Sequence, residues 1–231
     1  IWTSSNSGST WTENTTTGAG KSWENVTSSA DGTKLAVAEY GGSIWTSSNS
    51  GSTWTENTSA GTRNWRGLCS SADGTKLAAC VRAGKIWISN DSGSSWTEDT
   101  SIGVGKEWIN VVCSADFTKL TATVYGGYIW NSNDSGSTWT DDNAITSAKN
   151  WRGIAMSSDG TRLVANVWDG NIWTKLVSST GLYAHDWTED TSVGATKTWV
   201  DMTSSADGTK LAAVVWGYNI WTSSDSGATW T

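Results

Sequence analysis

The chain has 231 residues, a formal net charge of −7 and a sequence pI of about 4.6. This acidity argues against nucleic acid as a partner, because phosphate binding depends on Lys and Arg, and no apolar run is long enough to cross a bilayer. An odd number of Cys excludes a complete disulfide framework, and no His/Cys/Asp spacing suggests zinc, so we expect no metal and no cofactor.

The first predicted element is a Trp-rich β-hairpin over residues 1–14, and the first full unit follows from Lys21. In this unit residues 23–27 and 35–40 alternate as two strands around the turn at residues 30–33. Gly41-Gly42 then turns the chain into a second hairpin that begins at Ile44. Four strands in about 43 residues are typical of a propeller blade.

The same unit recurs along the whole chain, so we predict one all-β domain over residues 1–231. The expected units are 21–57, 63–99, 106–140, 149–190 and 197–231, preceded by the partial unit 1–14. The second strand of each unit is apolar on both faces, as expected when blades stack face to face. This predicts a β-propeller of four-stranded antiparallel blades, with five complete blades plus the N-terminal hairpin. Both five and six blades in the ring are compatible with that count.

The turn of the second hairpin follows the pattern Ser-x-Asp-x-Gly-x-x-Trp, as in Ser89, Asp91, Gly93 and Trp96. Asn6 and Asn49 replace the acid in two copies, and an insertion over residues 175–186, which holds the single His185, replaces one copy. This pattern resembles the Asp box of sialidase-type β-propellers. The resemblance implies a propeller fold, but not a particular activity, because the box is a structural turn.

Two columns of residues are expected at one end of the propeller. The first is a base two residues before the Trp that opens each unit: Lys21, Arg63, Lys106, Lys149 and Lys197. The second is an aromatic residue or a base at the end of the second strand: Tyr40, Arg82, Tyr125, Trp168 and Trp216. The opening tryptophans themselves lie beside them: Trp23, Trp65, Trp108, Trp151 and Trp199.

Aromatic faces suit the C–H faces of sugars, and Lys and Arg suit their hydroxyls and carboxylates, so these columns form a candidate glycan-binding surface. Repetition around a ring would add avidity. The alternative interpretation is structural: the basic side chains lie over Trp rings, and the aromatic residues pack at strand ends.

Enzymatic activity has weaker support in the sequence. A glycosidase needs two carboxyl groups at a defined separation, and Glu24, Glu39 and Asp201 do not recur as a pair. The sialidase resemblance would imply an arginine triad and a Tyr/Glu nucleophile pair, and only Arg66 and Arg152 share one strand position. We therefore expect no enzyme.

The combined expectation is an extracellular or cell-surface recognition module that binds glycans or glycoproteins. A structural component of an extracellular assembly, with other protein subunits as partners, is the alternative. A sialidase-type glycoside hydrolase is the third possibility.

Overall fold

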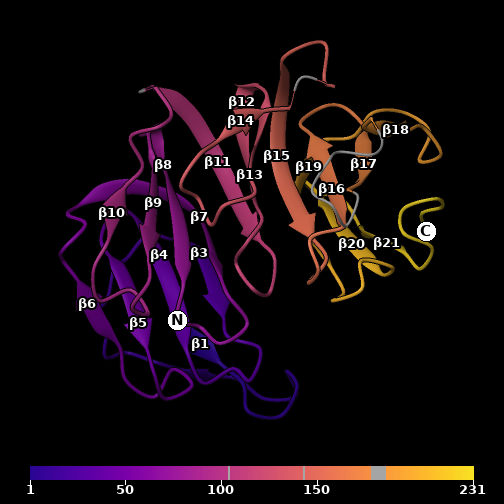
Figure 1. Ribbon diagram of the computed structural model, residues 1–231. Coiled ribbons are helices and arrows are strands. Elements are labelled where there is room, and N and C mark those ends of the chain that lie inside the picture. Colours follow the sequence, from indigo (N-terminus) through magenta and orange to yellow (C-terminus); the bar gives the residue numbers. More distant parts are fainter. Residues whose placement is uncertain (104, 143, 178–185) are drawn as a thin grey trace.

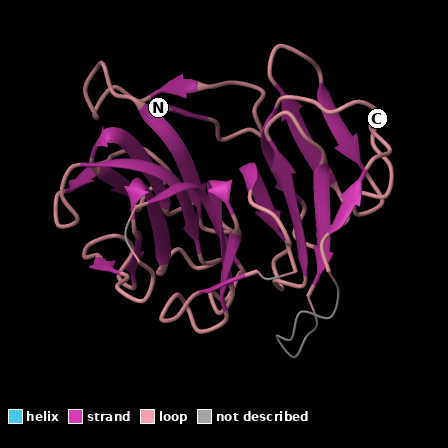
Figure 2. Ribbon diagram, turned by 90° about the horizontal axis from the view of Figure 1, so that it is seen from above, coloured by secondary structure: helices cyan, strands magenta, loops and turns pink. Residues whose placement is uncertain are grey.

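The computed structural model describes residues 1–103, 105–142, 144–177 and 186–231. Over these ranges the chain forms strands and turns without a helix (Figure 2), and therefore no helix able to span a membrane. The strands form small antiparallel sheets arranged side by side as the blades of a propeller (Figure 1). This confirms the prediction of an all-β propeller.

Each blade begins with an inner strand and a second strand joined by a tight turn. These pairs are β3 (Trp23–Ser28) with β4 (Leu35–Gly42), β7 (Arg63–Ser70) with β8 (Leu77–Gly84), β11 (Lys106–Cys113) with β12 (Leu120–Gly127), β15 (Lys149–Met156) with β16 (Arg162–Val167), and β19 (Trp199–Ser204) with β20 (Leu211–Val215). We call the connection between them the inner turn, and number the blades 1 to 5 in this order.

The outer half of a blade is a second hairpin, whose connection we call the outer turn. Its strands are β5 (Ile44–Ser47) and β6 (Thr55–Asn57), β9 (Ile86–Ser89) and β10 (Thr97–Glu98), β13 (Ile129–Ser132) and β14 (Thr140–Asp141), and β17 (Ile172–Leu176) and β18 (Thr188–Asp190). Blade 5 has β21 (Ile220–Ser223), against which Thr231 pairs through Thr222. The N-terminal hairpin is β1 (Trp2–Thr3) with β2 (Thr12–Glu13).

Neighbouring blades are joined by backbone hydrogen bonds at both ends of the inner hairpin. At one end the second strand pairs with the next inner strand, as β4 does with β7 through Tyr40 and Asn64. At the other end the inner turns of blades 1 to 4 each donate one backbone hydrogen bond to the inner turn of the following blade. The bonds, of 2.7–2.8 Å, run from Ala30 to Ala72, Ala72 to Ala115, Ala115 to Ser158 and Ser158 to Ala206.

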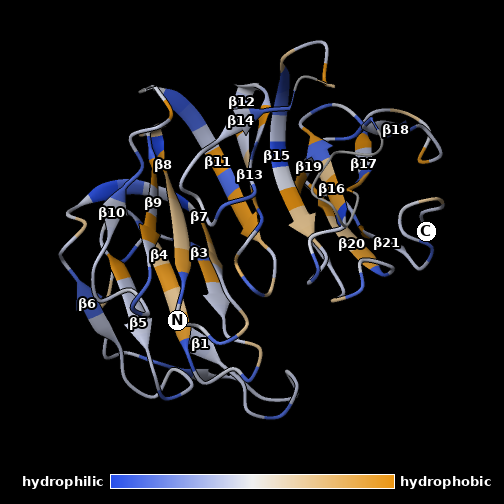
Figure 3. Cartoon of the chain, viewed as in Figure 1, coloured by the Kyte–Doolittle hydropathy of each residue, from blue (hydrophilic) through white to orange (hydrophobic). Residues whose placement is uncertain are grey.

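The core consists of apolar second strands and tryptophans whose rings meet edge to face or at a tilt. In blade 2 the ring of Trp65 lies 6.1 Å from that of Trp87 and 6.2 Å from that of Trp96, and all three are buried. Apolar residues concentrate along strands such as β4 and β8, and the loops are mostly polar (Figure 3). Cys80 belongs to this core as a free thiol, whose pKa burial raises to about 12.

Candidate ligand site at the mouth of the central channel

Five inner strands surround a channel along the propeller axis. At one end of the channel, which we call its mouth, the residue after each opening Trp lines a cavity of about 150 Å³: Glu24, Arg66, Ile109, Arg152 and Val200. A second cavity, of about 470 Å³, shares Glu24, Asn25, Asn110 and Asp201 with the first and continues along the same strands. The two arginines come from blades 2 and 4, so they alternate with uncharged or acidic positions around the axis.

A β-bulge at the start of the inner strand places these side chains in the channel. The register with the second strand shifts directly after the opening Trp, for example between Trp65 and Leu68, and a bulge of this kind redirects a side chain. In the arginine-bearing blades the next residue is Gly67 or Gly153. A Cβ atom at Gly67 would lie 2.6 Å from the backbone of Asn110, so only glycine lets the inner strands approach this closely.

Arg152 is the most distinctive group of the site. Its guanidinium carbon lies 4.4 Å from the ring centroid of Trp168 and 5.7 Å from that of Tyr125. Burial lowers the pKa of Arg152, and the nearby charge of Arg66 acts in the same direction. Within the described ranges no carboxylate pairs with Arg152, and its buried Nε atom has no hydrogen-bond acceptor. This cation is therefore partly desolvated and not neutralised.

The equivalent arginine of blade 2 is already paired. Arg66 donates to Glu24 and lies 5.2 Å from the ring of Tyr40. Beside it Arg82 donates to Glu107 over 2.9 Å, and this carboxylate raises the pKa of Arg82. The mouth of the channel thus combines three arginines with aromatic rings, and Arg152 alone among them has no acidic partner in the described structure.

Asp201 lies on β19, and its backbone lies beside Gly153 of blade 4. Its side chain lines the cavity and is solvent-exposed, but partial desolvation raises the pKa of its carboxyl group. Glu24 lines the same cavity. Of the three inward carboxyl groups considered from sequence, Glu39 lies elsewhere and pairs with Lys21 over 3.0 Å.

The predicted basic column has a packing position in every blade. Each base lies over the ring of the Trp near the start of the third strand of its blade. The Cζ atom of Arg63 lies 4.3 Å from the ring centroid of Trp87, and Nζ of Lys21 lies 4.9 Å from that of Trp45. Lys106, Lys149 and Lys197 do the same over Trp130, Trp173 and Trp221. These contacts match the structural interpretation of the column.

Among the opening tryptophans, Trp65, Trp108, Trp151 and Trp199 have no exposed surface, so we remove them from the candidate surface, and Trp23 is only partly exposed. Within the second-strand column the structure brings Tyr40, Tyr125 and Trp168 to the channel arginines. Trp216 instead lies exposed on the free side of blade 5, away from these contacts.

The inward position of Arg66 and Arg152 could have been found from sequence, since both follow an opening Trp, but the bulge that aims them has no sequence signature of its own. Asn25 and Asn110 had no signal that separates them from other polar strand residues. His185 lies outside the described residues. Within those residues, no group of three or more His, Cys, Asp and Glu is arranged to hold a metal ion.

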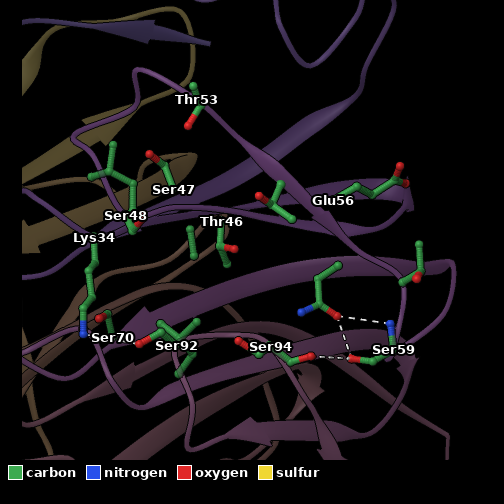
Figure 4. Close-up of a pocket in the computed structure, with 17 residues that line it drawn as sticks. Lys34, Thr46, Ser47, Ser48, Thr53, Glu56, Ser59, Ser70, Ser92 and Ser94 are labelled. Atoms are coloured by element: carbon green, nitrogen blue, oxygen red, sulfur yellow. Dashed lines mark hydrogen bonds between the residues drawn. The ribbon is translucent and has the colours of Figure 1, made fainter.

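A polar groove of about 530 Å³ also opens between the outer hairpins of blades 1 and 2 (Figure 4). It is lined by hydroxyl groups, and on one side Ser59 donates to Asn57 over 2.6 Å. A groove of similar volume, about 540 Å³, lies between blades 4 and 5. Equivalent residues line both grooves. We therefore interpret them as the wedge-shaped gap that neighbouring blades leave between their outer hairpins.

Comparison with known proteins gives structural matches only. No family model matches the sequence, and no curated protein matches it. The chain is similar in structure to the GH74 xyloglucanase of Xanthomonas campestris, with a TM-score of 0.71 and 17% identity over 91% of this chain. The match spans 38% of that enzyme's length.

Two protein-binding propellers are also similar. The structure of YCF48 bound to D1 peptide matches with a TM-score of 0.64 and 16% identity, over 91% of this chain and 68% of that chain. The nidogen/laminin complex matches with a TM-score of 0.69 and 13% identity, over 91% and 79%. At these identities the likeness shows the fold, a β-propeller used by both enzymes and binding proteins.

The expectation that the chain is not an enzyme is wrong. The xyloglucanase and two further GH74 enzymes share this fold, which is therefore compatible with catalysis. The sequence argument relied on a carboxyl pair repeated in every unit. A propeller has one axis, however, and carboxyl groups from different blades meet there without any repetition along the chain, as Glu24 and Asp201 do.

Proposed function

We propose that the mouth of the central channel binds a carbohydrate that carries a carboxylate, such as a uronate-containing glycan. The observation that supports this most is the unpaired guanidinium of Arg152, held against Trp168. Arg binds carboxylates through two parallel charge-assisted hydrogen bonds, which are stronger in a partly desolvated site. The exposed faces of Trp168 and Tyr125 would then contact the sugar ring. We also infer that the outer turns are Asp boxes.

The size of the site favours a small acidic group at the end of a larger ligand. A cavity of about 150 Å³ accommodates a carboxylate and part of one ring, while the rest of a ligand would lie on the aromatic residues at the mouth. A polypeptide could present a carboxylate too. Arginines beside flat aromatic faces suit an acidic sugar better, because one sugar residue can offer its carboxylate to the arginine and its C–H face to the aromatic ring.

The test is isothermal titration calorimetry with an oligogalacturonate and with the same oligosaccharide after reduction of its carboxyl groups. We expect the acidic form to bind at least about tenfold more tightly, and Arg152→Met to remove that difference. Lys210→Met is the matched control, since it removes one positive charge from an exposed position near the inner turns. Equal affinity for the two forms, or preference for an acidic peptide, would contradict the proposal.

Glycoside hydrolysis is a second candidate, favoured by one observation. Glu24 and Asp201 line one cavity, Glu24 is paired with Arg66, and partial desolvation raises the pKa of Asp201. Glycosidases likewise place two carboxyl groups in different surroundings at one site, with different roles for each. Release of reducing ends from xyloglucan and from polygalacturonate, with Asp201→Asn as the control, would test it. Activity that survives this substitution would exclude the assigned role.

A further inference from the structure

The ring of blades has an open side between blade 5 and blade 1, and apolar residues are exposed on it. Ile220 of blade 5 is 64% exposed, whereas the equivalent Ile44, Ile86, Ile129 and Ile172 are at most 1% exposed. Val214 is 36% exposed, and its four equivalents are fully buried. On blade 1 Val26 is 65% exposed, against at most 7% for the equivalent residues. Both flanks of the open side are therefore surfaces that are covered everywhere else.

The N-terminal hairpin lies beside blade 1 as the outer half of one more blade. The outer-turn Gly51 approaches Thr3 of β1, just as Gly93 approaches Thr46 and Gly227 approaches Thr174 of the preceding blade. Asn14 adds a 2.6 Å hydrogen bond to the carbonyl of Gly51. In Figure 2 the two termini lie on the same side of the molecule. The hairpin thus has the outer position of a blade without the inner strands that accompany it in blades 1 to 5.

The tryptophans of this hairpin are also uncovered. In blade 2 the ring of the opening Trp65 contacts the rings of both Trp87 and Trp96. Trp2 and Trp11 are the equivalents of those two partners, and they are 57% and 58% exposed. They lack the contact with an inner-strand Trp that Trp87 and Trp96 make with Trp65.

Backbone hydrogen bonding stops at the same place. The inner turns form a series from Ala30 to Ala206, each donating to the next. Within the described residues the N–H of Ala206 and the carbonyl of Ala30 have no partner in this series. One further inner turn would complete both bonds. Unpaired backbone groups beside exposed apolar strands are a template for strand addition.

We propose that this open side is the docking site for an inner β-hairpin of the same repeat. Its occupant carries an opening Trp, apolar residues on both faces of its second strand and an Asp-Gly inner turn. The Trp would lie between Trp2 and Trp11, the apolar residues would cover Val26, Val214 and Ile220, and the turn would join Ala206 to Ala30. A second copy of the chain has its own inner hairpins buried in its core, so it cannot supply one while folded.

The experiment adds the occupant to the full chain. Thr231 is equivalent to Thr55, and Ile1 to Ile86, so a copy of residues 56–85 fused after Thr231 has the length and register of the chain's own connections. The control carries Ser at the copies of Trp65, Leu68, Leu77 and Val81. We expect the midpoint of thermal unfolding to rise by about 5 °C or more over the control. Hydrogen exchange at the Ala206 amide should slow at least about tenfold.

A surface variant makes the result specific. Ile220→Ser should change the melting temperature of the original chain by less than about 2 °C, because the side chain is exposed, yet it should remove most of the gain in the fused chain. Ile172→Ser, at the buried equivalent, should destabilise both chains strongly. No difference between the fusion and its control would overturn the proposal. So would sedimentation that shows the original chain as a dimer whose Ala206 amide is already protected.

Discussion

The strand ends of the outer hairpins in blades 3 and 4 are held in two different ways. In blade 3 the turn is held locally: Ser132 Oγ accepts from Gly136 N over 2.9 Å, and Asp134 accepts from Thr138 N over 2.9 Å. The Nε1 of Trp139 donates to the carbonyl of Gly136. Each of these partners lies within a few residues in sequence, so these hydrogen bonds need nothing from a neighbouring blade.

In blade 4 the two strand ends of the outer hairpin, at Lys175 and Trp187, instead bind to the blade before it. Lys175 replaces the serine, and its Nζ lies 2.6 Å from Oδ2 of Asp142 in blade 3, with both side chains almost fully buried. The same oxygen accepts a 2.9 Å hydrogen bond from Trp187, which has the position of Trp139. The difference shows that the end of an outer hairpin can be held by a buried ion pair to another blade as well as by hydrogen bonds to nearby residues in sequence.

The largest expected effect comes from breaking that pair. Asp142→Ala leaves a buried ammonium without its carboxylate and also removes the acceptor of Trp187, so we expect a loss of about 3–5 kcal/mol in the free energy of unfolding. Guanidinium denaturation measures it. The double variant Asp142→Leu/Lys175→Met should recover most of the loss, and a loss below about 1 kcal/mol for the single variant would contradict the buried pair.

A smaller effect is expected from the backbone of the local turn. Gly136 has a φ of +85°, and a Cβ atom there would lie 2.8 Å from Ile88 of blade 2. Gly136→Ala should therefore cost about 2–3 kcal/mol, from left-handed backbone strain together with overpacking. Gly18→Ala separates the two terms, because its φ is +80° with no atom within 4 Å, and should cost about 1 kcal/mol. Equal losses would show that blade packing adds nothing.

Loss of the side-chain acceptor in the local turn should cost less. Asp134→Ala removes the bonds to Thr138 and should lower stability by about 1 kcal/mol, as for a helix cap. Asp134→Asn should be close to neutral, because Asn49 makes the same 2.9 Å contact to Thr53 N in blade 1. Thermal unfolding of both variants checks this, and a large loss for Asn would mean that the charge matters.

The smallest expected effect is a dependence of stability on pH, which arises only from turns whose side-chain acceptor is an Asp. Hydrogen bonds from Ser29 and Thr33 lower the pKa of Asp31 to about 2, and similar bonds lower the pKa of Asp207 and Asp225 to about 2. Because the folded pKa lies below the unfolded value of about 3.9, this stability is present above pH 4 and is lost as the pH falls to 2.

Melting temperatures between pH 2 and pH 5 measure this dependence. The triple variant with Asn at these three positions should melt with a weaker pH dependence than the unmodified chain. The two curves should converge towards pH 2. Parallel curves over the whole range would show that the carboxylates titrate alike in the folded and unfolded states.

The repeat made much of the fold predictable. The columns of Trp and the alternation in segments such as residues 35–40 identified strands and blades, because a copied unit repeats its local signals. The bulge after each opening Trp could not be predicted, since an extra residue in a strand changes pairing and not composition. Arg152 and Trp168 were both noticed, but their meeting depends on that bulge.

Contacts between blades were outside the reach of the sequence. Asp142 and Lys175 lie 33 positions apart and each looks like an ordinary surface charge in its own unit. Some contacts within a blade were also not predicted, since the basic column starting at Lys21 gave no sign of which Trp ring of its own blade it covers. A periodic sequence determines the unit well, but the partner of each side chain depends on how the units are stacked.

The chain of inner-turn hydrogen bonds has a genetic consequence. Each inner turn except that of blade 5 donates one bond to the next turn, and each except that of blade 1 accepts one from the turn before it, so every blade has a fixed polarity. Duplication of a whole unit within a gene would preserve all of these joints, and only the curvature of the ring would limit the number of copies. Unequal recombination within a unit would instead leave an inner-turn N–H or carbonyl without its partner, and selection would act against such products.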